Sequence, residues 1–409
     1  MSLISLVWNY LRAKPLNTIL NIFLLALGIA IITVLLLFNN QLNEKISSNA
    51  KGIDLVVGAK GSPLQLILCN IFHIDFPTGN IKLAEAEKVL RHRMIKKAIP
   101  LALGDSYKGY RIVGTNHDFA EHYNLTLASG DWWKSDLEVS VGATVAELAH
   151  LSIGDTFASA HGLTTDGHDH EESLYRVRGI LKKGNSVVDN LILTNIESIW
   201  KMHSVRGDSL SIPVHPSSIV PSVEAGDSVR EVTSLLVQYR NPLAVIQLPR
   251  FINSNSNLQA ASPAFETARL FSILGVGVDV LRGFAFVLIL ISGLSIFIAL
   301  YNSLKERQYD LAIMRSMGAS RSKLFVAIVM EGSFLTLMGS MEGVALGHGV
   351  LWLFTILIEQ SQKAGLTAAV FYIGEVYILG GSLLLGILCS LMPAVQAYRT
   401  DIHKVLAGN

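Results

Sequence analysis

The stretch KERQYDLAIMRSMGASRSK, residues 305–323, is a charged island between two long apolar runs, 284–301 before it and 324–358 after it. Five of its residues are basic: Lys305, Arg307, Arg315, Arg321 and Lys323. Lysine and arginine in short loops mark the side of a membrane that faces the cytoplasm. The island therefore predicts a cytoplasmic connection between two membrane spans.

The island also contains the pattern of a short amphipathic helix. Its apolar face is predicted to consist of Leu311, Ile313, Met314 and Met317. Its polar side carries Glu306, Arg307, Asp310 and Arg315. Gly318 is placed to end this helix, and Ser320 to cap the start of the next one. The alternative is a solvated loop, but an amphipathic helix outside the membrane indicates a surface that packs against another structure.

Two sequence features resemble a known family. The letters ER, then DLAIMRSMGAS, then Glu331 about a turn inside the next span, resemble the cytoplasmic coupling segment of ABC permeases of the MacB, FtsX and LolC type. The sequence MPA at 392–394, followed by a basic stub with Arg399 and Lys404, is similar to the tail of these permeases. The resemblance implies an ATPase-coupling role for ten residues: Glu306, Arg307, Asp310, Ile313, Met314, Arg315, Met317, Gly318, Ala319 and Ser320.

Composition bounds the class of protein. Half of the 409 residues are hydrophobic and 16% are charged, which indicates a membrane protein with a large part outside the membrane. The net charge of +1 excludes a nucleic-acid footprint, because no basic face is concentrated enough to neutralise many phosphates. The two cysteines, Cys69 and Cys389, fall on opposite sides of a predicted membrane boundary and cannot pair with each other.

The apolar runs predict four spans. Residues 1–15 are expected to form an amphipathic helix on the inner surface, and residues 16–38 the first span. A cleaved signal peptide is the alternative, but its apolar region would be shorter, so a retained anchor is favoured. The later segments are 266–304 (periplasmic stalk and second span), 305–323 (cytoplasmic loop), 324–358 (third span), 359–375 (short periplasmic loop), 376–398 (fourth span) and 399–409 (cytoplasmic tail).

Residues 39–265 are too polar to span and are predicted to fold outside the membrane. Strands are expected at 54–57, 110–113, 137–141, 175–180, 191–194 and 229–239, helices at 83–93 and 243–253, and a turn at 253–263. The phrase VSVGATVAELAHLSIG at 139–154 is similar to the MacB-like periplasmic core domain, which implies a Porter-like lobe built from both ends and a Sabre-like lobe inserted in it. Residues 280–402 would be the FtsX-like permease domain.

The predicted fold class is therefore an α-helical membrane protein with four transmembrane helices and a large α+β periplasmic domain between the first and second. This arrangement places both termini in the cytoplasm of a bacterium and the protein in its inner membrane. Within the third span, Gly339, Gly343 and Gly347 recur every four residues, a spacing that allows two helices to approach closely, within one chain or between two.

Two carboxylates in the third span are unusual for a membrane. Glu331 is expected to pair with Arg315, Arg321 or Lys323 near the cytoplasmic boundary. Glu342 has two interpretations, a proton or ion site together with His348, or a polar contact inside the helix bundle.

The segment 161–172 has the most unusual local composition in the chain. Imidazole and carboxylate groups of the kind that Zn²⁺ or Ni²⁺ binds occur at His161, Asp166, His168, Asp169, His170 and Glu171. The segment has the composition of an exposed, mobile loop, and the spacing is looser than that of a structural zinc site. Weak zinc binding and a solvated loop with chance histidines both stay open.

No catalytic or nucleotide-binding motif is present in the sequence. GIDLVVGAKGS at 52–62 lacks the glycine followed by Lys-Ser/Thr that cradles phosphates in a Walker A loop. The energy is thus expected to come from another polypeptide, and the chain is expected to bind no cofactor. The resemblance implies a non-catalytic permease subunit. Its expected partners are cytoplasmic ABC ATPase subunits, a second permease (the same chain or a sister), a periplasmic adaptor or binding protein, and lipids.

The resemblance implies mechanotransmission as the function, in which ATP hydrolysis on another subunit moves the periplasmic domain to act on a periplasmic or membrane cargo. One alternative is an FtsX-like scaffold that activates a periplasmic partner and transports no solute. Another is a metal-handling system linked to zinc.

Overall fold

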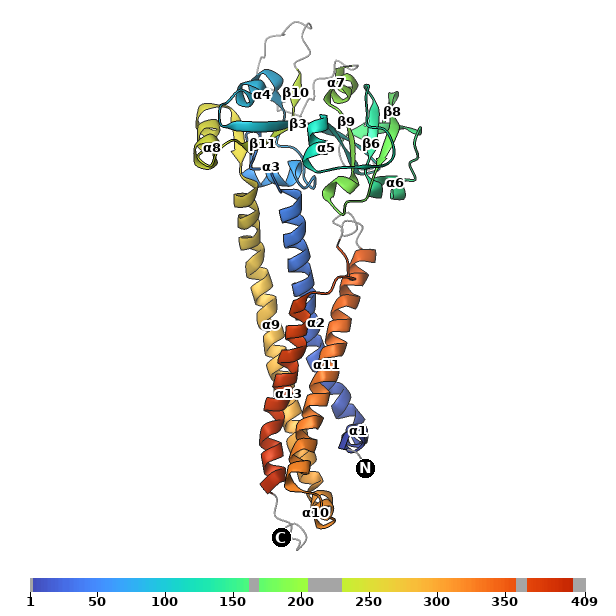
Figure 1. The fold of residues 1–409 in the computed structure, drawn as a ribbon, viewed down its shortest axis with the longest axis vertical. Coiled ribbons are helices and arrows are strands. Elements are labelled where there is room, and N and C mark those ends of the chain that lie inside the picture. Colours follow the sequence, from blue (N-terminus) through green and yellow to red (C-terminus); the bar gives the residue numbers. More distant parts are fainter. Residues whose placement is uncertain (1–2, 162–168, 205–229, 358–365, 400–409) are drawn as a thin grey trace, which may run out of the picture. The chain divides into compact units, whose positions relative to one another are not determined.

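The computed structural model describes residues 3–161, 169–204, 230–357 and 366–399 of the chain (Figure 1). The chain separates into two units, one formed by Met1–Asn43 with Ile273–Asn409 and the other by Glu44–Ser272. The first unit is helical, and the second is built on a β-sheet. The C-terminal stub that carries Lys404 lies outside the described residues.

Among its described residues, the helical unit contains two short helices, α1 (Leu3–Ala13) and α10 (Gln308–Ser316). Its four long helices are α2 (Pro15–Asn49), α9 (Pro263–Glu306), α11 (Arg321–Leu357) and α13 (Ile373–Arg399). All four long helices have the length and apolar composition to cross a membrane. They agree with the four predicted spans.

Two of the long helices extend beyond the membrane-length runs. Helix α9 is continuous from Pro263 to Glu306, so the predicted stalk and second span form one helix. Helix α2 continues to Asn49, past the predicted end of the first span at residue 38. Its last turns contain no glycine or proline, and Lys45 donates a hydrogen bond to the carbonyl of Asn185 at 2.8 Å. The sheet-containing unit therefore begins at Glu44 rather than at residue 39.

The second unit has one large sheet in the order β12-β1-β11-β3-β4-β9-β6-β8-β5, and β7 pairs with β3 and β8. The strands are β1 (Leu55–Ala59), β3 (Ile95–Tyr107), β4 (Tyr110–Thr115), β5 (Leu127–Gly130), β6 (Glu138–Val141), β7 (Thr156–His161), β8 (Asp169–Leu181), β9 (Leu191–Asn195), β11 (Ser234–Tyr239) and β12 (Leu258–Ala261). A small second sheet pairs β2 (Ile81–Lys82) with β10 (Glu231–Val232). The helices are α3 (Pro63–Asn70), α4 (Leu83–Leu90), α5 (His117–His122), α6 (Ala143–Ala149), α7 (Ile196–Ser204), α8 (Ala244–Asn255) and the short 3-10 helix η1 (Val187–Asn190).

Two hydrophobic cores lie along this sheet. One combines residues from both ends of the unit, including Leu55, Val237 and Leu248. The other comes from the middle of the unit and includes Ile112 and Tyr175. Strand β3 belongs to both regions, because its first half pairs with β11 and its second half with β4. The register between β3 and β4 shifts between Leu103 and Ser106, which marks a β-bulge.

Several predictions of local structure were wrong. The predicted turn at 253–263 contains β12, which forms because it pairs with β1, a segment about 200 residues away in sequence. The predicted strand at 229–239 is two strands, separated at Thr233, whose N–H donates to the carbonyl of Leu101 at 2.7 Å. Strand β3 was missed, because Pro100 and Gly104 argue against a strand in an isolated sequence.

Candidate functional site

The joint between α9 and α10 holds a buried polar site of the helical unit. Arg307 stands alone between the two helices, with φ −99° and ψ 9°. Immediately after it, α10 buries Leu311 and Ala312, and Leu311 packs in a cluster with Leu304, Leu324 and Ile328. The direction in which α10 leaves α9 is therefore fixed by packing on one side and by Arg307 at the corner.

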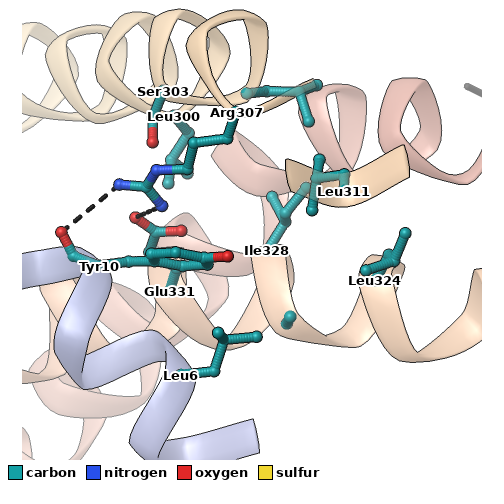
Figure 2. Close-up of a pocket in the computed structure, with 11 residues that line it drawn as sticks. Leu6, Tyr10, Leu300, Ser303, Arg307, Leu311, Leu324, Ile328 and Glu331 are labelled. Carbon is teal, nitrogen blue, oxygen red and sulfur yellow. Dashed lines mark hydrogen bonds and ion pairs between the residues drawn. The ribbon is translucent and has the colours of Figure 1, made fainter. Parts of the chain in front are cut away.

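Figure 2 shows the guanidinium of Arg307 directed at the Glu331 carboxylate and at the backbone of Tyr10. The distance from Nη1 to Glu331 Oε1 is 3.6 Å. Nη2 donates to the Tyr10 carbonyl at 3.4 Å, and the guanidinium carbon lies 3.8 Å from the centre of the Tyr10 ring. The Arg307 and Glu331 side chains are 14% and 10% exposed. Two charges so far from water are stable only as a pair.

This ion pair lies in a small pocket bounded by α1, α9, α10 and α11. The lining residues are Leu6, Tyr10, Leu300, Ser303, Leu304, Arg307, Leu311, Leu324, Ala327, Ile328 and Glu331. Burial raises the pKa of the Tyr10 phenol, and the charge of Arg307 opposes this shift. The phenol therefore stays neutral at physiological pH, and its ring serves as the apolar and cation–π partner of the guanidinium.

Helix α1 completes the joint. The sequence predicts an amphipathic helix here, and the structure buries Val7 and Leu11 of this helix in the helical core. The Trp8 ring meets the edge of the Phe334 ring on α11, with centroids 5.7 Å apart. Lys14 forms an ion pair with Glu306, the last residue of α9. The apolar face of α1 thus packs against the chain itself.

The predicted apolar face of α10 is divided between two sides of the helix. Leu311 is buried and Met314 packs partly against the core, but Ile313 and Met317 are 37% and 82% exposed. They follow Tyr309, which is 59% exposed, at intervals of four residues. We call Tyr309, Ile313 and Met317 the outer stripe. Tyr309 was missed in the sequence, although its spacing with Ile313 is a signal that could have identified it.

The residues after α10 form a compact turn. Gly318 has φ +98°, its N–H donates to the Arg315 carbonyl, and the N–H of Ala319 donates to the Met314 carbonyl, both at 3.0 Å. These two bonds constitute a Schellman motif, which glycine adopts at low cost. The Ser320 hydroxyl accepts a hydrogen bond from the N–H of Lys323 at 3.3 Å and caps α11. Of the remaining predicted coupling residues, Glu306 and Asp310 are exposed and Arg315 is half-buried.

The predicted partners of three ionisable residues in the bundle need correction. Glu331 pairs with Arg307 rather than with Arg315, Arg321 or Lys323. His348 pairs with Glu375 on α13, at 3.1 Å between Nε2 and Oε2, rather than with Glu342. Glu342 is exposed on α11, so neither expected environment for it is found. Both true partners, Arg307 at the joint and Glu375 on α13, lie in parts of the chain that the sequence alone does not bring together.

The three glycines of α11 that recur every four residues, Gly339, Gly343 and Gly347, lie against α2. A Cβ atom on Gly339 would come within 3.2 Å of the Ile22 carbonyl, and one on Gly343 within 2.8 Å of the Ala26 carbonyl. A Cβ on Gly347 would lie 2.7 Å from that of Thr33. Only glycine allows the two backbones to approach this closely.

The predicted metal residues are only partly described. His161 ends β7, whereas Asp169, His170 and Glu171 lie within β8, and Ala160 pairs with Asp169 across this hairpin. The second half of the supposed loop is therefore strand. Asp166 and His168 lie outside the described residues. In the part of the chain that the structure describes, no three histidine, cysteine, aspartate or glutamate side chains are placed to hold a metal ion.

Two protein families match the sequence. The MacB-like periplasmic core domain matches residues 18–239, more than half of the chain, and the FtsX-like permease C-terminal family matches residues 282–402. The first match runs from α2 through β11 of the sheet-containing unit, and the second covers the later helices.

Individual relatives are distant. An ABC transporter permease of Methanocaldococcus jannaschii is 25% identical over 58% of this chain and 56% of its own length. The pyoverdine export ATP-binding/permease protein PvdT of Pseudomonas aeruginosa is 21% identical over 98% of this chain and 58% of its own. The lipoprotein-releasing system transmembrane protein LolC of Buchnera aphidicola is 20% identical over 90% and 85%. The chain thus spans little more than half of the first two.

Among solved structures, the periplasmic region of MacB from Actinobacillus actinomycetemcomitans is 12% identical, with 55% of this chain and 97% of that chain covered and a TM-score of 0.33. The two family matches and the four apolar helices identify the family. The chain therefore belongs to the ABC transporter permeases of the MacB, FtsX and LolC type, as a membrane protein with a MacB-like periplasmic core domain.

Proposed function

We propose that this chain is the non-catalytic subunit that an ABC ATPase drives through α10, in a mechanism of mechanotransmission. The observation that carries the proposal is the outer stripe. One side of α10 is buried in its own chain by Leu311 and Ala312, while the opposite side exposes three apolar residues. An exposed apolar stripe on a short helix with a fixed direction suits a groove on a partner protein.

The joint supplies a physical route for the motion. A push on the outer stripe would move α10, and Arg307 would transmit it because its guanidinium contacts both α1 and α11. Helix α9 ends at the same joint and is continuous over 44 residues. A continuous helix carries rigid-body motion without a water-filled path.

The remaining assignments extend this proposal. The ATPase is a separate subunit on the cytoplasmic side, where α10 and both termini lie. A second permease, identical or related, completes the complex, with a periplasmic adaptor or binding protein and lipids as further partners. The core built from both ends of the sheet-containing unit is the Porter-like lobe, and the middle core is the Sabre-like lobe. The cargo is a periplasmic or membrane molecule.

Docking of the ATPase on the outer stripe is tested by substituting an exposed residue of the stripe, which leaves the fold unchanged. Ile313→Asp places a charge in the apolar contact and is expected to weaken ATPase binding at least about tenfold, equivalent to about 1.4 kcal/mol. Ile313→Leu keeps the apolar contact and is the matched control. The measurement is the amount of ABC ATPase that co-purifies with each variant, together with ATP hydrolysis by the purified complex. Equal recovery with both variants would refute docking at the outer stripe.

A link to zinc is proposed on the composition of residues 161–172 alone. The structure changes how it should be tested, since a deletion of 166–172 would remove the start of β8. Replacing His161 and His170 by alanine leaves the strand backbone intact. If calorimetry then shows unchanged Zn²⁺ binding, these residues do not hold the metal.

A further inference from the structure

Residues 366–372, which precede α13, connect three helices of the bundle and are called the strap. Gln41 on α2 donates to the Thr367 carbonyl at 2.8 Å and accepts from the Thr367 N–H at 2.9 Å. His348 on α11 contacts the Ala368 carbonyl through Nδ1 at 2.6 Å. Glu375 on α13 accepts from the N–H of Tyr372 through Oε1 at 3.0 Å. The strap therefore links α2, α11 and α13.

The contact between His348 and Glu375 requires a proton. A backbone carbonyl can only accept a hydrogen bond, so Nδ1 of His348 must carry hydrogen toward Ala368. The other ring nitrogen, Nε2, lies 3.1 Å from Oε2 of Glu375. Whether the contact between these two atoms is attractive depends on whether one of them carries a hydrogen. If Nε2 carries no hydrogen and Glu375 is ionised, a lone pair faces a carboxylate. One proton on either atom turns this repulsion into a hydrogen bond.

The pair is shielded from water, which strengthens this requirement. The His348 and Glu375 side chains are 13% and 5% exposed. The Phe371 ring of the strap lies over the imidazole, with centroids 4.5 Å apart. A carboxylate this deeply buried needs either a charged partner or a proton of its own.

We propose that His348 and Glu375 form a proton-binding site that closes the strap across α2, α11 and α13 when one proton is bound between them and releases α11 when it is lost. This site differs in position and chemistry from the joint at Arg307. The proposal holds whether or not α10 docks on an ATPase, because it concerns the opposite end of α11.

The groups around the pair leave this proton as the variable charge. Residues 16–43, 324–357 and 373–398 contain no lysine or arginine. The titratable groups near the pair on the adjoining elements are Glu342 on α11, Tyr372 in the strap and Tyr377 on α13. Helix α2 contributes the uncharged amide of Gln41, and its next turn carries Glu44 and Lys45, whose ammonium group donates to the Asn185 carbonyl. Glu342 is exposed and precedes His348 by six residues, about 9 Å along the helix axis. Tyr377 is 73% exposed.

The proposal fixes the direction of the pH effect. In the pH range where the open strap has lost this proton, closing the strap takes up one proton. The ratio of closed to open strap therefore falls by up to about tenfold for each unit of rising pH. The strap is closed in acid and open in alkali.

The experiment is hydrogen exchange of the full chain in lipid nanodiscs between about pH 5 and about pH 9, the range in which histidine changes charge. Protection factors of the Thr367 and Tyr372 amides are measured, which removes the intrinsic effect of pH on exchange. In the wild type they should fall with rising pH. In Glu375→Gln the amide group can donate to a neutral His348, so protection should persist at every pH.

Glu342→Gln removes a carboxylate from the exposed face of the same helix and should keep the wild-type profile. If Glu375→Gln instead opens the strap at every pH, His348→Gln decides the question, because its amide contacts Glu375 without taking up a proton. A flat profile in either variant, with a sloping wild type, supports the site. A flat wild-type profile, or the wild-type slope in both variants, overturns it.

Discussion

The two ends of α11 each hold a buried carboxylate against a basic side chain, but with different bases. At one end Glu331 meets Arg307, and at the other His348 meets Glu375. Arginine keeps its charge at every pH that proteins tolerate, whereas histidine loses its charge near neutrality. The different bases therefore give a permanent connection at the α9–α10 joint and, in our proposal, a conditional one at the strap. A helix held in this way can be released at one end only.

The largest effect is expected from breaking the permanent pair. Arg307→Leu leaves Glu331 buried without its cation and should cost about 3–5 kcal/mol of stability. The reduction in the thermal unfolding midpoint of the detergent-solubilised chain measures this cost. Arg307→Leu combined with Glu331→Leu removes both charges and should recover most of the loss. A single variant as stable as the wild type would show that the pair is solvated rather than buried.

A smaller effect is expected between the two pairs, where α11 packs on α2. Gly343→Ala places a Cβ 2.7 Å from that of Ile29 and should destabilise the chain by about 1–3 kcal/mol through overpacking. Gly349→Ala is the matched control, since a Cβ there meets no atom within 4 Å and alanine favours a helix. Equal unfolding midpoints for the two variants would mean that α2 and α11 are not in close contact.

The smallest effect concerns Tyr10, the aromatic partner at the permanent end. Tyr10→Ala removes the ring under the Arg307 guanidinium and should cost about 0.5–2 kcal/mol, whereas Tyr10→Phe keeps the ring and should cost less. Because burial raises the pKa of Tyr10, its folded form resists deprotonation. The contribution of Tyr10 to the free energy of unfolding is thus fully present below the pKa of the unfolded chain, about 10. It is lost as the pH rises through the pKa of the folded form. Chemical unfolding at neutral and alkaline pH measures both effects, and Tyr10→Phe should lack the alkaline loss.

The comparison also separates what the sequence could predict from what it could not. The four long helices, the continuity of α9, the stop at Gly318 and the cap at Ser320 follow from composition and from residues a few positions apart. The partners of Glu331 and His348 do not, because each lies more than 20 residues away in sequence and outside the helix of its partner. Proximity in sequence predicted Arg315 as a partner of Glu331 and Glu342 as the partner of His348. Tertiary packing instead brings Arg307 to Glu331 and Glu375 to His348. Strand β12 was missed for the same reason, since its partner β1 is remote in sequence.

Strand β3 has a mechanical consequence for the sheet-containing unit. Its 13 residues run past both hydrophobic cores, so a load on one core passes to the other through main-chain hydrogen bonds. Separating the two cores would require all the main-chain hydrogen bonds between β3 and a neighbouring strand to break at once. Bending is far cheaper, and the irregular register between Leu103 and Ser106 is where the ladder is already interrupted. The unit should therefore respond to force as a sheet that flexes at this bulge, and its stiffness should depend on how residues 104 and 105 are packed.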